Sequence, residues 1–355
     1  MKFKLSDISS MKYGSLPKHK SVDGQYPIFT GYKTSGYSDE FNVEDPEIVV
    51  VARGVGGTGD VKMAPGPAWI TNLSIILRVN PDLVNKKYLQ LKLAGMGLRY
   101  LDSGSAQSQI TIKDLSEVKI DLPDLDVQTK VAKTIQMFED KISNLQAIND
   151  NLLELAQQIF VGKYLSKQDS FPMTTLSEIV GVKTGTFNPK KSNDNDVAHF
   201  SLPAFDSGSV PTVDLVDSIK SNKNIITQYT VLASKMNPTT KRVWIPNYVQ
   251  GMTNVASTEF LTFNASDEYQ QAFIWAVVDS EEYQNHLISG ATGSTGSRQR
   301  IKPGDAYSFE VGYDPDEAHR IGMILNPLLQ KVKNNRDEIV TLVQLRDNLL
   351  TNLLN

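Results

Sequence analysis

Two short polar segments of the sequence carry side chains that could recognise nucleic-acid bases. The first reads SGSAQSQ (Ser103 to Gln109) and the second reads GSTGSRQR (Gly293 to Arg300). Glutamine can form two hydrogen bonds to adenine in the major groove, arginine can do the same to guanine, and serine hydroxyls suit phosphates. Tracts of this composition also form plain loops, so the prediction gains weight only because both segments precede the last strand of a repeated unit. The candidate DNA-binding residues here are Ser105, Gln107, Gln109, Ser297, Arg298, Gln299 and Arg300.

A glycine cluster, RGVGGTG (Arg53 to Gly59), follows a predicted buried strand. It is not a P-loop, because Asp60 stands where that motif has lysine. It is not a dinucleotide fingerprint either, because the following VKMAPGPAWI is strand-like and broken by proline, so no helix begins there. Two interpretations stay open, a turn without a ligand or a backbone-rich loop that approaches a DNA backbone. For the second, the candidates are Arg53, Thr58 and Lys62.

The basic residues are spread over both halves of the chain. Residues 1–125 carry 15 basic and 14 acidic groups, and residues 171–314 carry 11 basic and 15 acidic groups. Neither half is a polycation, so any contact with DNA needs a local face or a partner that adds positive charge. Further candidates for such a face are Lys33, Lys235, Lys241 and Arg242, although each could also be an ordinary solvated charge.

Several classes of function are disfavoured by what the sequence does not contain. It has no cysteine, and its four histidines do not have metal-ligand spacing. Neither a Gly-x-Ser-x-Gly elbow, an HExxH pair nor the N/D-P-P-Y/F signature of adenine methyltransferases occurs. We therefore expect a non-catalytic chain without a metal or cofactor of its own; a hydrolase that uses the polar loops is the less favoured alternative. The lack of a signal peptide and of a membrane-spanning run predicts a cytoplasmic protein without a membrane partner.

The elements that must position these side chains occur twice. Residues 1–125 predict a mixed domain with strands at 47–52, 68–79 and 115–122 and a helix at 85–94. Residues 173–314 repeat the pattern, with strands at 229–234, 241–245 and 259–263 and a helix at 270–288. The openings KLSDISSMKYGSLPK and TLSEIVGVKTGTFNPK and the later INDNLLE and LRDNLLT recur in the same order. A whole unit was therefore duplicated.

Each domain is followed by a stretch of heptad spacing, at residues 126–165 and 315–355, and residues 166–172 form a connector. A shift of 197 places Asn149 on Arg346, so the polar interruption falls at the same heptad position in both stretches. We expect two long helices that pair antiparallel, with Asn149 and Arg346 in a shared polar layer. The alternative is that each long helix packs on its own domain.

The chain resembles the specificity subunit of type I restriction-modification systems. The resemblance is carried by GSAQSQITIKDLSEVKIDLPDLDVQTKV (Gly104 to Val131), by the opening LSDI and by YPIFTGY (Tyr26 to Tyr32). In the longest of these, the matching positions are Gln107, Ile112, Leu122, Pro123, Leu125 and Gln128. The second copy reads VGYDPDEAHRI (Val311 to Ile321) and lacks the Leu-Pro pair and the glutamine. The resemblance spans the chain, but this departure leaves the boundary of the second domain open.

This resemblance implies an α+β fold with two mixed α/β target-recognition domains, two long antiparallel coiled-coil spacer helices and a pseudo-two-fold internal repeat. Each domain would read one half of a bipartite target on double-stranded DNA, and the helices would set the separation of the halves. Two modification subunits would dock on the chain, bind S-adenosylmethionine and methylate adenine, and a restriction subunit would use ATP and Mg²⁺. The competing interpretation is a structural or adhesive protein, such as a phage fibre component, which should form parallel trimers.

Overall fold

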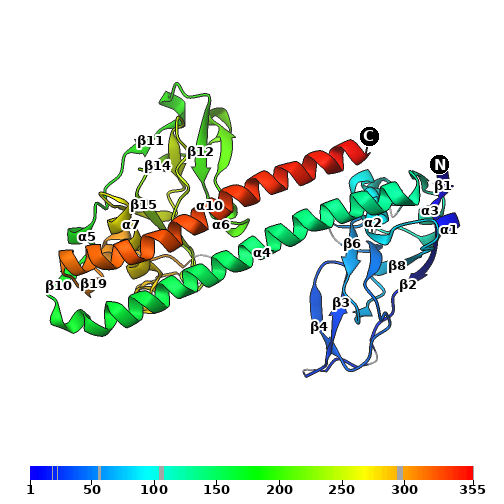
Figure 1. Cartoon of the computed structure of the whole chain (residues 1–355), viewed down its shortest axis with the longest axis horizontal. Helices are drawn as coiled ribbons and strands as arrows, with labels where there is room; N and C mark the ends of the chain where they lie inside the picture. Colours follow the sequence, from blue (N-terminus) through cyan, green and yellow to red (C-terminus); the bar gives the residue numbers. More distant parts are fainter. Residues whose placement is uncertain (18, 22, 55–56, 104–107, 294–298, 355) are drawn as a thin grey trace. The chain divides into compact units, whose positions relative to one another are not determined.

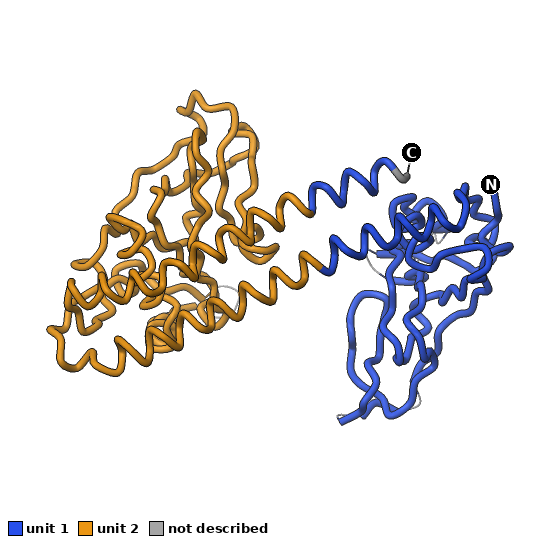
Figure 2. Tube along the Cα trace, in the orientation of Figure 1, with its two compact units in different colours: residues 1–140, 343–355 blue, residues 141–342 orange. Residues whose placement is uncertain are grey.

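The structure is a computed structural model that describes residues 1–17, 19–21, 23–54, 57–103, 108–293 and 299–354. The chain divides into two compact units (Figure 2). Unit 1 comprises residues 1–140 and 343–355, and unit 2 comprises residues 141–342. The two long helices predicted from the heptad spacing are present, and each contributes residues to both units (Figure 1).

The core of unit 1 is a four-stranded antiparallel sheet in the order β2-β8-β5-β6. Its strands are β2 (Ser9–Tyr13), β8 (Ser74–Val79), β5 (Glu47–Val51) and β6 (Val61–Ala64). All five residues of β5 are buried, as its continuous apolar run predicts. Helix α2 (Lys86–Met96) contributes to the same core and begins at Asn85, whose side chain accepts a hydrogen bond from the backbone amide of Tyr88.

Two smaller groups of elements complete unit 1. One is a three-stranded sheet of β4 (Thr34–Ser38), β3 (Tyr26–Phe29) and β7 (Trp69–Ile70). The other closes the unit and consists of β1 (Lys2–Lys4), α1 (Leu5–Ile8), the 3₁₀ helix η1 (Leu98–Leu101), α3 (Ile112–Ser116) and β9 (Lys119–Asp121). The strand that we predicted at 115–122 is shorter and comprises only β9. The residues before it form α3, which begins with a capping box of Thr111 and Asp114.

Unit 2 repeats this frame. Strand β10 (Met173–Thr175) pairs with β19 (Glu310–Gly312) as β1 pairs with β9, and the core strands β15 (Thr230–Ser234) and β18 (Phe260–Asn264) are antiparallel, as are β5 and β8. Strand β16 (Val243–Trp244) extends this core sheet. Two short helices, α5 (Leu176–Ile179) and α9 (Pro303–Tyr307), occupy the places of α1 and α3. These matches confirm the internal repeat.

The predicted helix at 270–288 is two helices, α7 (Glu268–Asp279) and α8 (Glu281–Ser289). The break falls at Ser280, whose backbone is extended and whose hydroxyl accepts a hydrogen bond from the amide of Tyr283. Serine competes with helical hydrogen bonding in this way, and it therefore starts a new helix inside an otherwise helical pattern.

The middle of unit 2 differs from that of unit 1. A five-stranded sheet stands where unit 1 has three strands, and its order is β11-β14-β17-β12-β13. Its strands are β11 (Thr186–Phe187), β14 (Lys223–Ile225), β17 (Asn254–Ala256), β12 (Asp196–Phe200) and β13 (Thr212–Leu215), joined through η3 (Pro189–Lys191), α6 (Leu202–Asp206) and η4 (Val216–Ser218). The duplicated frame thus carries unequal inserts.

The long helices are α4 (Leu125–Lys163) and α10 (Pro315–Leu354), and η2 (Leu165–Ser170) lies in the predicted connector. The first turn of α4 is anchored in unit 1 by the buried Gln128. Its side chain accepts a hydrogen bond from the amide of Asn85 at 3.0 Å and donates to the carbonyl of Pro123 at 2.9 Å. The last turns of α4 are anchored in the core of unit 2. This core buries Ala156 and Phe160 of the helix and also Tyr164, which directly follows it.

The two helices pair antiparallel within unit 2. Lys141 pairs with Glu338 at 3.3 Å, Asn149 accepts a hydrogen bond from Asn335 at 2.7 Å, and the Tyr164 hydroxyl donates to the Gly312 carbonyl just before α10. Partner numbers fall as residue numbers rise along α4, which is the antiparallel order. Both asparagines are buried. We predicted a layer shared by Asn149 and Arg346; the structure shows Asn149 bonded to Asn335, while Arg346 donates to its neighbour Asp347.

Helix α10 also packs closely on the domain of unit 2. Arg336, 7% exposed, donates to the carbonyl of Ile245 at 2.9 Å, and Lys333 donates to Gln271 at 2.9 Å. Burial, with Arg336 nearby, lowers the pKa of Lys333 to about 8, against a smaller opposing effect of Glu268. In unit 2 the long helices therefore pair with each other, as predicted, and α10 also packs on its own domain, as the alternative has it.

The low pKa of Lys333 predicts a pH-dependent stability. Between pH 8 and 10.5 the unfolded chain binds one more proton at this lysine than the folded chain, so its contribution to the free energy of unfolding rises with pH in that window. Lys333→Met removes the titration. From pH 8 to 10.5 the free energy of unfolding of the wild type should therefore rise relative to that of the variant, by on the order of 1–3 kcal/mol. Urea unfolding at several pH values measures it; parallel curves would contradict the prediction.

Two searches of the described part of the chain found nothing. None of its helices is both long and apolar enough to cross a membrane. Within the same residues, no group of three or more histidine, cysteine or acidic side chains could hold a metal ion.

Candidate nucleic-acid interface

In unit 1 the structure brings together Arg53, the first residue of the glycine cluster, and Gln109, the last residue of the polar segment. Arg53 and Gln109 form an antiparallel backbone bridge, and the amide of Ile110 donates to the carbonyl of Ala52 at 2.9 Å. Gln109 is held further by Asp102, which accepts a hydrogen bond from its amide at 2.8 Å. Arg53 is exposed and Gln109 is partly exposed. Two candidates that are 56 positions apart in the sequence are thus neighbours just beyond the end of the interior strand β5.

The glycine cluster packs around the ring of Tyr32. A Cβ at Gly57 would overlap with this ring, so the Tyr32 side chain would have to move. The ammonium of Lys62 lies over the Tyr32 ring, 5.5 Å from its centre. Lys33, the residue after Tyr32, is exposed. Burial, and to a lesser degree the charge of Asp60, raises the pKa of the Tyr32 hydroxyl. Lys33, Arg53 and Lys62 are therefore next to, or in contact with, the residues that pack at the Tyr32 ring.

Thr58 has a different place from the one we expected. Its side chain is 2% exposed, and its hydroxyl donates to the carbonyl of Gly54 at 3.1 Å. This hydroxyl closes the loop from inside, so Thr58 is a structural residue of the glycine cluster and is poorly placed to contact DNA.

Unit 2 repeats the arrangement around its own polar segment. Met236 and Arg300 form a backbone bridge, the amide of Asn237 donates to the carbonyl of Gln299 at 2.9 Å, and the amide of Ile301 donates to the carbonyl of Lys235 at 3.1 Å. Lys235, Gln299 and Arg300 are therefore brought together, just as Arg53 and Gln109 are in unit 1. Four other candidates, Ser105, Gln107, Ser297 and Arg298, lie outside the described residues.

Three of the basic candidates in unit 2 are engaged by carboxylates of the same chain. Lys241 pairs with Asp279 at 3.0 Å. Arg242 donates to both oxygens of Asp206 at 2.7 and 3.0 Å, and Arg300 donates to both oxygens of Glu259 at 3.0 and 3.3 Å. Burial raises the pKa of Asp279, although Lys241 acts in the opposite direction. A DNA phosphate would have to compete with these carboxylates, so unit 2 offers less unpaired positive charge than its sequence suggests.

The sequence analysis missed the three carboxylates that pair with these cations, although the acidic excess of residues 171–314 is the signal of their presence.

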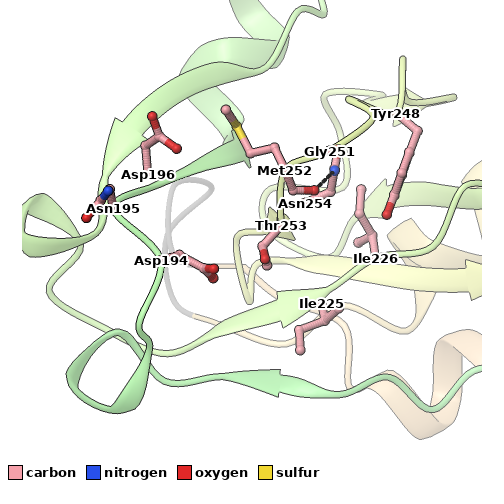
Figure 3. A pocket seen from close by; sticks show the side chains of 10 residues that line it. All are labelled: Asp194, Asn195, Asp196, Ile225, Ile226, Tyr248, Gly251, Met252, Thr253 and Asn254. Carbon is pink, nitrogen blue, oxygen red and sulfur yellow. Dashed lines mark hydrogen bonds between the residues drawn. The ribbon is translucent and has the colours of Figure 1, made fainter.

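Another missed feature is a hollow of about 540 Å³ at one end of the five-stranded sheet (Figure 3). It is lined by Asp194, Asn195, Asp196, Ile225, Ile226, Tyr248, Gly251, Met252, Thr253 and Asn254. The buried side chain of Asn254 holds one wall through hydrogen bonds with the backbone of Val249 and Met252. Its carboxylates suit hydrogen-bond donors and would repel phosphates.

Comparisons with known proteins agree with this architecture. Residues 1–154 match the family model described as the type I restriction modification DNA specificity domain. The EcoprrI specificity subunit of a type I restriction enzyme from Escherichia coli is 24% identical over 151 residues, which cover 41% of this chain and 37% of that protein. The putative type I specificity subunit S.MpnORF507P of Mycoplasma pneumoniae is 21% identical over 207 residues, 53% of this chain and 56% of that protein. The matches span less than two thirds of either relative.

A solved structure shows the same fold over the full length. The crystal structure of a type I restriction-modification S subunit from M. genitalium covers 100% of this chain, and 96% of that chain is covered in return, with a TM-score of 0.68 and 18% identity. The first 154 residues therefore belong to the type I restriction-modification DNA specificity domain family, and the fold of the whole chain is that of a specificity subunit.

Proposed function

We propose that this chain is the DNA-specificity subunit of a type I restriction-modification complex and that each domain reads one half of a bipartite target. The observation that carries the proposal is the duplicated frame, which places the last residues of a polar segment beside the residues that follow a core strand in both domains. The inserts of the two frames differ, with three strands in one and five in the other. A shared frame with different surfaces suits the recognition of two different half-sites.

The proposed division of labour gives this chain no catalytic step. Two modification subunits would dock on the long helices and the domains, bind S-adenosylmethionine and methylate adenine, and the paired helices would set the separation of the half-sites. A restriction subunit, where present, would use ATP and Mg²⁺. The net charge of -4 and the three carboxylate-paired cations of unit 2 support this dependence on partners, because the chain offers little net attraction for DNA by itself.

The adhesive fibre is not supported as an alternative. A fibre of parallel trimers needs helices that associate between chains, whereas α4 and α10 pair antiparallel within one chain in unit 2.

The proposal is tested by exchanging residues 1–140 for the matching part of a specificity subunit with a different target. This cut keeps Gln128 with its partners Asn85 and Pro123. We expect methylated adenines, mapped in cells that carry the full system, to change in one half of the target and to keep the other half. An unchanged target, or the loss of both halves in a complex that still assembles, would refute the proposal.

A further inference from the structure

The backbone hydrogen bonds of the repeated frame match individual positions of the two domains. In unit 1 the amide of Ala52 donates to the carbonyl of Leu73 at 2.8 Å, and in unit 2 the amide of Lys235 donates to the carbonyl of Glu259 at 3.0 Å. Ile110 and Ile301 likewise donate to the carbonyls of Ala52 and Lys235. Leu73 therefore corresponds to Glu259, and the residues before the two isoleucines, Gln109 and Arg300, correspond to each other.

At these matched positions unit 2 has a charged pair. The Glu259 carboxylate accepts hydrogen bonds from two nitrogens of Arg300, and one of these also lies 3.4 Å from the sulfur of Met236. The Arg300 side chain is 43% exposed and that of Glu259 is 29% exposed. A guanidinium held at two nitrogens loses most of its rotational freedom, while the side chain as a whole stays partly exposed.

The scaffold does not require this pair. Unit 1 builds the same frame with Leu73 and Gln109, which cannot form an ion pair, and an ion pair at this exposure adds little to stability. The pair thus orders an arginine at the position where the other domain presents a glutamine. Arginine suits the edge of guanine, and glutamine suits the edge of adenine. The two domains therefore hold, at one matched position, residues that prefer different bases.

We propose that Glu259 is a positioning residue that aims the guanidinium of Arg300 at a base edge, and that positions 109 and 300 are specificity-determining in their respective half-sites. This inference rests on the proposed function. Holding the arginine beforehand lowers the entropy lost on contact with DNA, and the carboxylate restrains the guanidinium from binding phosphates of any sequence.

The experiment maps methylated adenines in cells that carry the full system with Glu259→Gln, Glu259→Leu, Glu259→Asp or Arg300→Gln in this chain. We expect Arg300→Gln to reduce discrimination at one position of the second half-site by about 5- to 100-fold. Glu259→Gln and Glu259→Leu should relax the same position by about 3- to 10-fold, and Glu259→Asp should restore part of it. The first half-site should be unchanged. Glu317→Leu, which removes the carboxylate of another exposed ion pair with Arg320, is the matched control and should leave both halves intact.

Three results would overturn the inference in different ways. Methylation that falls equally at all sites with unaltered base preference would make Glu259 a structural residue. Tighter binding of the assembled complex to every sequence, with a steeper salt dependence, would show that Glu259 only neutralises Arg300. A wild-type map without any bipartite target that depends on this chain would overturn the proposed function together with the inference.

Discussion

Replacing Phe160 with alanine is expected to destabilise unit 2 by about 3–5 kcal/mol. The side chain is fully buried, and its ring stacks on Tyr164 at 5.5 Å between centroids and meets Phe273 edge-on at 5.9 Å. Phe160 belongs to the long helix α4, whereas Phe273 belongs to helix α7 of the domain. The truncation therefore removes one of the contacts that join the helix to this core and leaves a cavity that the neighbours fill only in part.

Guanidinium unfolding followed by circular dichroism measures this effect. The next residue of the same helix, Val161, is 49% exposed and provides the matched control. Val161→Ala should change the stability by less than about 0.5 kcal/mol. Equal losses in the two variants would show that α4 is not anchored through Phe160.

The second large effect is expected for Gly322→Ala in helix α10. A Cβ at Gly322 would lie 2.8 Å from the carbonyl carbon of Tyr269 and closer still to its oxygen, and both are backbone atoms of helix α7. The two helices would have to move apart along a tightly packed face. We expect a loss of about 1–3 kcal/mol, although alanine is intrinsically the better helix former.

Gly162→Ala in helix α4 is its control, because nothing lies within 4 Å of the added carbon. Only the helix preference acts at this site, and it should stabilise the protein by up to about 1 kcal/mol. The same substitution should thus have opposite signs in the two long helices, as measured by thermal unfolding. A stabilising Gly322→Ala would contradict the close approach of α10 and α7.

The long helices and the repeated frame could be predicted because their signals are local. Heptad spacing and the order of the repeated motifs are both visible along the chain. The partner of Asn149 could not be found in this way. A shift of 197 residues relates equivalent positions of the two copies, whereas antiparallel pairing relates positions whose numbers change in opposite directions. The second relation sets Asn149 against Asn335, and it follows from three-dimensional packing alone.

For the candidate interface, too, only the features that are local in the sequence could be predicted. Residue types that suit bases and phosphates identified Gln109, Arg242 and Arg300, and the structure places Gln109 and Arg300 at matched positions. The carboxylates that hold the arginines lie 36 and 41 positions away in the sequence. Contacts over such distances are made by the sheet topology, so composition could indicate an acidic surplus but could not say which arginine it occupies.

The anchoring of helix α4 at both ends has a consequence for how genes of this kind can recombine. Gln128 near its start is part of the first core, and Phe160 near its end is part of the second. A crossover at either end of the helix would separate one of these side chains from its own domain. A crossover inside the helix, after Ala132 and before Leu153, would leave these contacts of both cores intact. We therefore expect viable natural or engineered hybrids to have their junctions inside the codons of the helix and not at its borders.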